Sequence, residues 1–232
     1  MNKLFALILI GMALTGCALE QVRNEPPVTQ AVSGECPKLD AAVDVQLGLV
    51  RQMLDQDRAY AGLAHLAALD PTVQASAQAR YLQAELLRHT GRAQEAETYY
   101  KGLLGSCIAG YGHHGLGLLA AEQDLPRAVV ELREAARYLP TDPRVRNDLG
   151  YALLLTHDVP AARREFMTAV ELGDYKQRAS LNLVLLMLYA GDDQGAGKLG
   201  RQLKLSEGEL ERLRRRAVDL RATLKTEPKK ES

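Results

Sequence analysis

Two kinds of side chain in this sequence could do chemistry: five histidines and three cysteines. His113 and His114 are adjacent, and imidazole is a common zinc ligand. Neighbouring side chains on a helix point about 100° apart, so these two would not readily share one tetrahedral ion. No second His or Cys stands four residues from either of them. We interpret both as ordinary polar or groove-lining histidines, and we expect no metal and no cofactor.

The sequence motifs of common enzyme classes are missing. We find no GxSxG, HExxH, GxxxxGK[ST] or CxxC. Gly112, Gly115 and Gly117 form a glycine-rich stretch, but no strand precedes it to build a phosphate loop, and close helix packing or an irregular helix explains it better. The 29 basic residues balance 29 acidic ones, so no global field attracts nucleic acid. We expect neither an enzyme nor a nucleic-acid-binding protein.

The elements that position these residues are predicted to be helices in a repeat. Hydrophobic residues make up 47% of the chain but aromatic residues only 5%, which favours close-packed helices over a β-sandwich. The segment Asp124 to Ala128 recurs 34 residues later as Asp158 to Ala162, and Asp192 continues the series. A 34-residue period with small residues at fixed places is typical of tetratricopeptide repeats (TPR), each a helix-turn-helix unit. We therefore predict an all-α, right-handed TPR solenoid of helix pairs and not a bundle without repeats.

Local signals predict where the helices begin. Asp124, Asp158 and Asp192 can cap the second helix of their units, and Ser206 with Glu209 forms a capping box. The box predicts a last helix over 206–225 that covers the apolar face of the final unit. Its arginine-rich side is interpreted as a solvated face and not as a membrane-binding one. The predicted units are 40–73, 77–110, 109–142, 143–176 and 177–210, which together make up a repeat region over 39–210.

The first residues of the chain have the features of an export signal. Lys3 precedes an apolar run from Leu4 to Leu14, which is shorter than the roughly 20 residues that cross a bilayer. Residues 14–17, Leu-Thr-Gly-Cys, resemble the lipobox of bacterial lipoproteins. The resemblance implies a signal peptide over 1–16 and a lipid on Cys17; ordinary secretion with a chance cysteine is the alternative.

The same resemblance predicts a location. Position 18 is Ala and not the Asp that retains many such lipoproteins at the inner membrane, which implies anchoring in the outer membrane, facing the periplasm. Residues 17–38 are predicted to form a flexible tether, and residues 226–232 a disordered tail. Export would place Cys36 and Cys107 in an oxidising compartment. Their spacing cannot establish geometry, so a disulfide and two unpaired thiols both stay open.

Stacked helix pairs leave a concave groove lined by their first helices. The TPR resemblance implies which positions face it, and their Tyr and Arg side chains suit a peptide or helix ligand. The set lacks the Lys and Asn residues with which some TPR modules clamp a terminal carboxylate, so we do not predict recognition of chaperone tails. The implied groove residues are Tyr81, Glu85, Arg88, His113, Arg144, Asn147, Tyr151, Arg178 and Leu181.

A narrower resemblance rests on the combination of lipobox, tether, repeats and two segments, Val145 to Leu154 and Arg178 to Leu183. Together they resemble the TadD-type lipoproteins of the Flp pilus (tight adherence) secretion machinery. The resemblance implies a scaffold that helps to place an outer-membrane secretin or another pilus component through protein–protein binding. A pilotin-like lipoprotein of a type IV pilus, and an adaptor that regulates a periplasmic cell-wall enzyme, are the alternatives.

Overall fold

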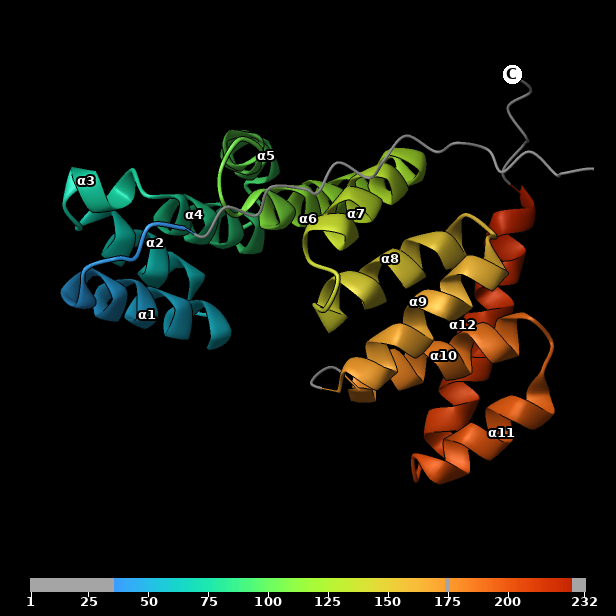
Figure 1. Ribbon diagram of the computed structural model, residues 1–232. Helices are drawn as coiled ribbons and strands as arrows, with labels where there is room; N and C mark the ends of the chain where they lie inside the picture. The colour runs from blue at the N-terminus through green and yellow to red at the C-terminus, as the bar shows by residue number, and fades with distance from the viewer. Residues whose placement is uncertain (1–35, 174–175, 227–232) are drawn as a thin grey trace, which may run out of the picture. The chain divides into compact units, whose positions relative to one another are not determined.

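The computed structural model describes residues 36–173 and 176–226. Within these ranges every regular element is a helix, as Figure 1 shows. The predicted signal peptide, the predicted lipidation site Cys17, most of the predicted tether and most of the predicted tail lie outside the described residues. The helices are α1 (Ala41–Asp55), α2 (Ala59–Ala67), α3 (Pro71–Gln74), α4 (Ala77–His89), α5 (Ala93–Leu103), α6 (Ala109–Ala120), α7 (Leu125–Tyr138), α8 (Pro143–Leu155), α9 (Val159–Leu172), α10 (Lys176–Tyr189), α11 (Asp193–Gln202) and α12 (Glu207–Thr226).

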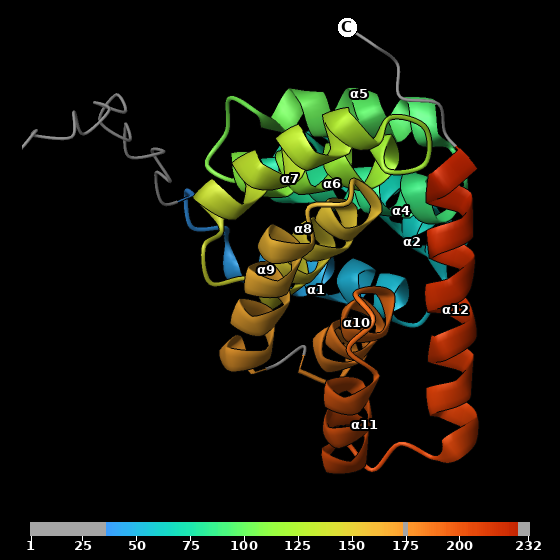
Figure 2. The same ribbon diagram turned by 90° about the vertical axis from the view of Figure 1, so that its right-hand side faces the viewer.

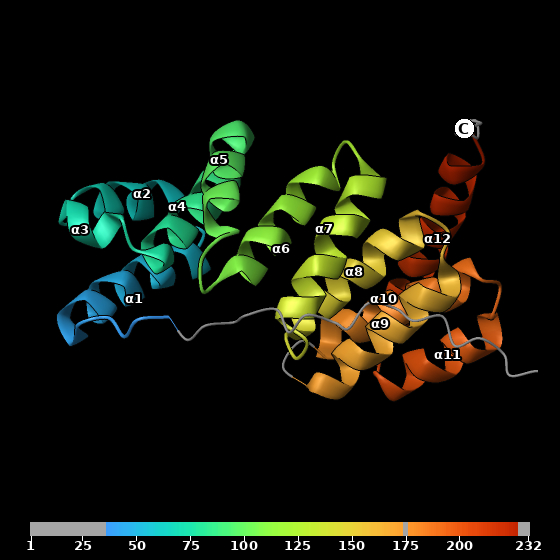
Figure 3. The ribbon, with the colours of Figure 1, turned by 45° about the horizontal axis from the view of Figure 1, so that its top comes forward.

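Consecutive helices pack side by side from α4 to α11, and Figure 3 shows the succession of pairs. The second helices α7, α9 and α11 begin 34 residues apart, because the same cap starts each of them. Asp124, Asp158 and Asp192 each accept a hydrogen bond from the backbone amide three residues on, at 3.1, 3.1 and 2.8 Å. The predicted caps are thus confirmed. The short α3 occupies a longer connection between α2 and α4, where the strict period is lost.

Small residues mark the places where two helices of a pair cross. Ala128, Ala162 and Ala196 are fully buried, as the repeat predicts. A β-carbon added to Gly150 on α8 would lie 2.8 Å from the ring of Phe166 on α9, so only glycine lets this ring sit against the helix backbone. Leu132 and Phe166, 34 positions apart, fill the space beside these contacts. The pattern of small and large residues therefore sets how closely each pair packs.

The last helix, α12, begins with the predicted capping box. The backbone amide of Ser206 donates to the Glu209 carboxylate at 2.8 Å, and the amide of Glu209 donates to the Ser206 hydroxyl at 3.3 Å. Leu210, Leu213 and Ala217 join the core cluster around α8 and α10. The helix packs mainly on α10, beside which it runs in Figure 2, and not on α11 as the first helix of a further repeat would. It therefore turns toward the side of the stack that carries the first helices.

A disulfide joins the start of the described chain to the middle of the stack. Cys36 and Cys107 are bonded, with their Cα atoms 5.1 Å apart and 71 positions between them in sequence. Cys36 precedes α1, and Cys107 lies in the loop between α5 and α6. The structure thus shows the disulfide, whereas the sequence left a disulfide and two unpaired thiols both open. Across residues 36–173 and 176–226, no helix combines the length and apolarity needed to span a bilayer.

Candidate protein-binding groove

The first helices α4, α6, α8 and α10 line one face of the stack, which we call the groove face. Two pockets open on it. The first pocket has a volume of 470 Å³ and lies among α6, α8, α10 and α12. The second pocket has a volume of 490 Å³ and lies among α1, α4, α6 and the start of α8. Both volumes fall in the range of pockets that bind ligands or anchoring side chains.

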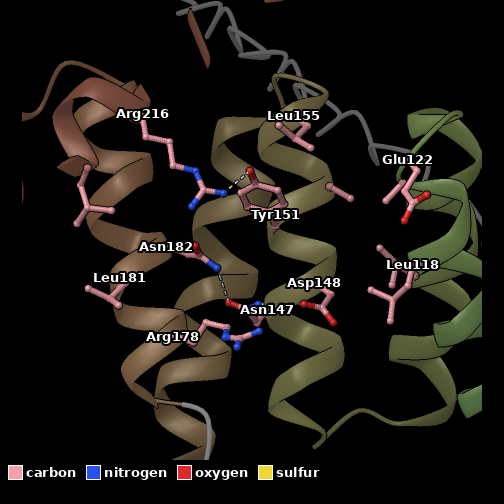
Figure 4. A pocket seen from close by; sticks show the side chains of 14 residues that line it. Leu118, Glu122, Asn147, Asp148, Tyr151, Leu155, Arg178, Leu181, Asn182 and Arg216 are labelled. Carbon is pink, nitrogen blue, oxygen red and sulfur yellow. Dashed lines mark hydrogen bonds between the residues drawn. The ribbon is translucent and has the colours of Figure 1, made fainter. Parts of the chain in front are cut away.

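A chain of polar side chains runs from His114 on α6 to the floor of the first pocket, where Figure 4 labels Asp148, Asn147 and Asn182. His114 Nε2 on α6 lies 2.8 Å from Oδ2 of Asp148 on α8. The Asn147 amide donates to Oδ1 of Asp148 at 3.0 Å, and the Asn182 amide on α10 donates to Oδ1 of Asn147 at 2.8 Å. Asn147 is only 2% exposed, so its partners satisfy groups that water cannot reach. The network ties three successive first helices together.

Apolar walls rise on both sides of this floor. Leu118 of α6 forms one wall, and Leu181 of α10 with Leu213 of α12 forms the other. Arg216 of α12 reaches over the floor and donates to the Tyr151 hydroxyl at 2.7 Å, with its guanidinium 5.4 Å from the ring centroid (Figure 4). The last helix therefore contributes a wall and a cation to the pocket, besides covering the end of the stack.

The second pocket is lined by aromatic and charged groups. The rings of Tyr81 on α4 and Tyr111 on α6 lie 5.1 Å apart, tilted by 47°. Burial, followed by the charge of Glu85, raises the pKa of Tyr81, so its hydroxyl stays neutral at physiological pH. Arg144 borders the same pocket and forms an ion pair with Asp142 at 2.7 Å. Tyrosine and arginine are the residue types most often found as anchors in protein interfaces.

A buried cluster supports the wall of the second pocket. Glu85 on α4 is 8% exposed; it accepts a hydrogen bond from the Tyr100 hydroxyl of α5 and pairs with Arg88 at 2.8 Å. Burial acts to raise the pKa of Glu85, but the charge of Arg88 and the hydrogen bonds from Arg88 and Tyr100 outweigh it and hold the pKa below its ordinary value. Glu85 is therefore a buried anion that fixes α4 against α5, with only its edge at the pocket.

His113 does not lie in either pocket, contrary to the prediction that it lines the groove. Its Nδ1 lies 2.8 Å from Glu131 of α7, and its ring stacks on Tyr138 of the same helix. His114 also lines neither pocket, but its Nε2 is directed toward Asp148, which lines the first pocket. The prediction applied the 34-residue period to α6. Leu132 and Phe166 keep that period, but the glycines that face them, Gly117 of α6 and Gly150 of α8, are 33 positions apart.

The shift by one residue has a cause in the turn between α6 and α7. In the other pairs this turn contains one residue with positive φ: Asp57, Gly91, His157 or Gly191. In the turn of residues 121–124, all of which the structure describes, no residue has a positive φ. The stretch from the packing glycine to the cap is one residue shorter here, seven positions from Gly117 to Asp124 against eight from Gly150 to Asp158. The first helix is therefore displaced relative to the caps that keep the strict period.

The other predicted groove residues, except Arg88, divide between the two pockets. Tyr81, Glu85 and Arg144 line the second pocket. Asn147, Tyr151, Arg178 and Leu181 line the first. Arg88 binds Glu85 and Tyr100 in the buried cluster. Sequence reasoning missed residues of the first pocket that lie one position off the repeat or outside it: Asp148, Asn182, Leu213 and Arg216. It also missed His114, which contacts Asp148.

The two adjacent histidines point in different directions, toward α7 and α8, as helix geometry predicts. In the part of the chain that the structure describes, no three His, Cys, Asp or Glu side chains gather so that they could hold a metal ion. Polar side chains on the floor of the first pocket are paired with one another, and aliphatic and aromatic side chains line both pockets beside charged ones. This arrangement suits the binding of another chain.

These observations define the class of protein: consecutive helix pairs with a 34-residue period form a TPR solenoid. No protein-family model matches the sequence. The chain is 38% identical over 224 residues to the TPR repeat-containing protein PA4299 of Pseudomonas aeruginosa, and the match covers 96% of this chain and 85% of that protein. The chain belongs to the TPR repeat-containing proteins.

Solved structures share the fold. MamA of Desulfovibrio magneticus RS-1, from residue 41 to its end, superposes with a TM-score of 0.56 over 75% of this chain and 98% of that one, at 16% identity. PilF of Pseudomonas aeruginosa superposes with a TM-score of 0.60 over 79% of this chain and 88% of that one, at 19% identity. At these identities the likeness concerns the fold alone.

Proposed function

We propose that this protein is a periplasmic docking scaffold for assembly of the Flp pilus (tight adherence) secretion machinery, anchored in the outer membrane by a lipid on Cys17. In this proposal the groove face holds a secretin or another pilus component while it is placed. The resemblance of residues 14–17 to a lipobox and of the repeat segments to TadD-type lipoproteins supports the pathway. The TPR fold and the aliphatic and aromatic side chains that line the pockets of its groove face support the scaffold role.

The observation that carries the proposal is the first pocket. Its walls come from three helices distant in sequence, α6, α10 and α12, and its floor from α8. The floor is held in place by hydrogen bonds between helices, while leucine side chains and the Tyr151 ring remain accessible. A rigidly held floor beneath accessible aliphatic and aromatic side chains is typical of a hot spot in a protein interface.

The proposal predicts which variants lose the partner. We would crosslink living cells, purify the anchored protein from membranes and identify the captured proteins for wild type, Tyr151→Ala, Arg216→Glu and Arg144→Glu. Capture of the Flp secretin should fall with the first two variants if the first pocket binds it, and with Arg144→Glu if the second pocket does. The matched control is Tyr60→Ala, since Tyr60 is 75% exposed on α2 and lines neither pocket.

Deleting the gene should abolish surface Flp pili. Normal piliation together with a full set of secretin multimers would contradict the proposal. Capture of a type IV pilus secretin would instead support the pilotin alternative, and capture of a cell-wall enzyme the adaptor alternative. If no groove variant alters the captured proteins, binding by the groove face should be abandoned.

A further inference from the structure

The outward side of α1, at the first end of the stack, is uncharged and partly apolar. Helix α1 packs mainly on α2 and α4 and buries Leu47 and Val50 against them (Figure 3). On the opposite side of the helix Val45 is 74% exposed and Leu49 is 42% exposed. The exposed residues of this side form a stripe without a charged member, which we call the end stripe: Ala41, Ala42, Val45, Gln46, Leu49 and Gln52.

The charged residues of α1 lie on another side of the helix. Asp44, Arg51 and Asp55 are exposed, but they project about 100° away from Val45 around the helix axis. Arg51 and Asp55 line the second pocket. A surface helix normally carries its charged residues opposite the core, where water solvates them. Because α1 has aliphatic and amide side chains there instead, its composition indicates a surface that another molecule covers.

A glycine at the margin of the end stripe supports this interpretation. Gly48 lies in the middle of α1, where glycine is less favourable than alanine. A β-carbon at Gly48 would meet no atom of the described chain within 4 Å, so packing inside the chain does not require a glycine there. Together with Ala41 and Ala42, Gly48 leaves room for the backbone of another helix to come close.

We infer that a second copy of this chain covers the end stripe, with the two α1 helices antiparallel about a twofold axis. The stripe is self-complementary, because aliphatic groups pack on their own kind and each glutamine amide carries both donors and an acceptor. A stripe with a net charge would repel its copy. An axis level with Leu47 places Val45 of each copy against Leu49 of the other, and Ala42 against Gln52.

The far end of the stack disfavours a head-to-tail arrangement. There α12 exposes Arg212, Arg214 and Arg215. An end stripe laid on these side chains would take guanidinium groups out of water against a surface without an anion. Two equal ends joined about a twofold axis instead close the assembly as a dimer. The groove face stays open in such a pair, so the inference goes beyond the proposed function and can fail without it.

The first test traps the pair by crosslinking, because one helix against its copy is a smaller contact than a standard interface of about 1,600 Å². Two differently tagged copies of the full chain are expressed together, and their membranes are treated with a bifunctional maleimide. Leu49→Cys is compared with Met167→Cys on α9, since the native side chains are 42% and 46% exposed. The disulfide protects Cys36 and Cys107, and Cys17 is common to both variants.

We expect a crosslinked product that carries both tags for Leu49→Cys and none above background for Met167→Cys. A Leu49→Cys variant that crosslinks no better than Met167→Cys overturns the inference. So does a product that joins Leu49→Cys to a different protein, because that protein would then cover the end stripe.

The second test asks whether Val45 and Leu49 meet across the axis. Both side chains are exposed, so Val45→Glu and Leu49→Lys should keep the fold, as circular dichroism verifies. Each variant alone should raise the dimer dissociation constant at least about tenfold, because it buries a charge without a partner. An equimolar mixture should restore association, since opposite charges then face each other. Sedimentation equilibrium of the purified full chain measures this. A mixture that associates no better than either variant alone, or a wild type that stays monomeric, overturns the inference.

Discussion

Gly115 on α6 faces the ring of Tyr100 on α5, and replacing this glycine by alanine tests how the two helices pack. An added β-carbon would lie 2.1 Å from Cε1 and 2.3 Å from Cζ of Tyr100. The Tyr100 side chain is fully buried, and its hydroxyl is bonded to Glu85 and Arg88. The ring cannot turn away without breaking these bonds, so the helices must move apart.

The magnitude follows from two opposed effects. Overpacking a close contact costs typically 1–3 kcal/mol and sometimes more, whereas alanine in a helix is favoured over glycine by about 0.8–1 kcal/mol. Because the clash meets ring atoms of a pinned side chain, we expect Gly115→Ala to lower the free energy of unfolding by about 2 kcal/mol. For a chain of this size that lowers the melting midpoint by roughly 4–8 °C.

The matched control is Gly102→Ala on α5. A β-carbon there would meet nothing within 4 Å, so helix propensity alone should act and raise the free energy of unfolding by about 0.5–1 kcal/mol. Thermal unfolding followed by far-ultraviolet circular dichroism, with hydrogen exchange of the α6 amides, measures both variants. In a Tyr100→Leu background, where the ring atoms are gone, Gly115→Ala should cost at least about 1 kcal/mol less.

The reasoning is refuted if Gly115→Ala melts at or above the wild-type midpoint while Gly102→Ala is stabilising. Equal effects of Gly115→Ala with and without the Tyr100 ring would refute it as well. Either result would mean that α5 and α6 adapt to the extra methyl group without loss, and that the α6 glycines do not set their spacing.

Three further predictions concern single contacts. Reducing the Cys36–Cys107 disulfide, or changing both residues to Ser, should lower the free energy of unfolding by roughly 4 kcal/mol, because the bond closes a loop over a sequence separation of 71 and so restricts the unfolded chain. Denaturant titrations with and without reductant measure this. The pKa of Glu85 in the folded protein lies below its ordinary value, so its ionised carboxylate stabilises the fold above pH 4.5, and this stabilisation is lost as the pH falls through the folded pKa. Glu85→Gln should therefore have a lower free energy of unfolding at neutral pH, and that free energy should fall less in acid than it does for wild type. An acid-unfolding profile equal to that of wild type would contradict this. Ser206→Ala removes the capping box and should cost about 1 kcal/mol, with faster hydrogen exchange in the first turn of α12; exchange equal to wild type would show that the cap is dispensable.

Much of the fold is determined by the sequence alone, because the signals are local. The caps at Asp124, Asp158 and Asp192 and the box at Ser206 act within three residues of themselves, so their roles can be predicted without knowing the rest of the chain. Alanines at fixed offsets from these caps likewise predict which residues are buried at each crossing. A periodic pattern of this kind specifies helix pairs and their stacking.

Only the tertiary structure decided which side chains meet on the groove face. Between the packing glycine of α6 and the cap of α7 one residue is missing relative to α8 and α9, and this directs His113 toward α7 and His114 toward α8, although the caps keep their period. The contact of Arg216 with Tyr151 joins residues 65 positions apart and depends on α12 packing on α10. Local patterns fix where each helix starts, but the rotation of one helix against its neighbours, and the path of the last one, result from packing between distant residues.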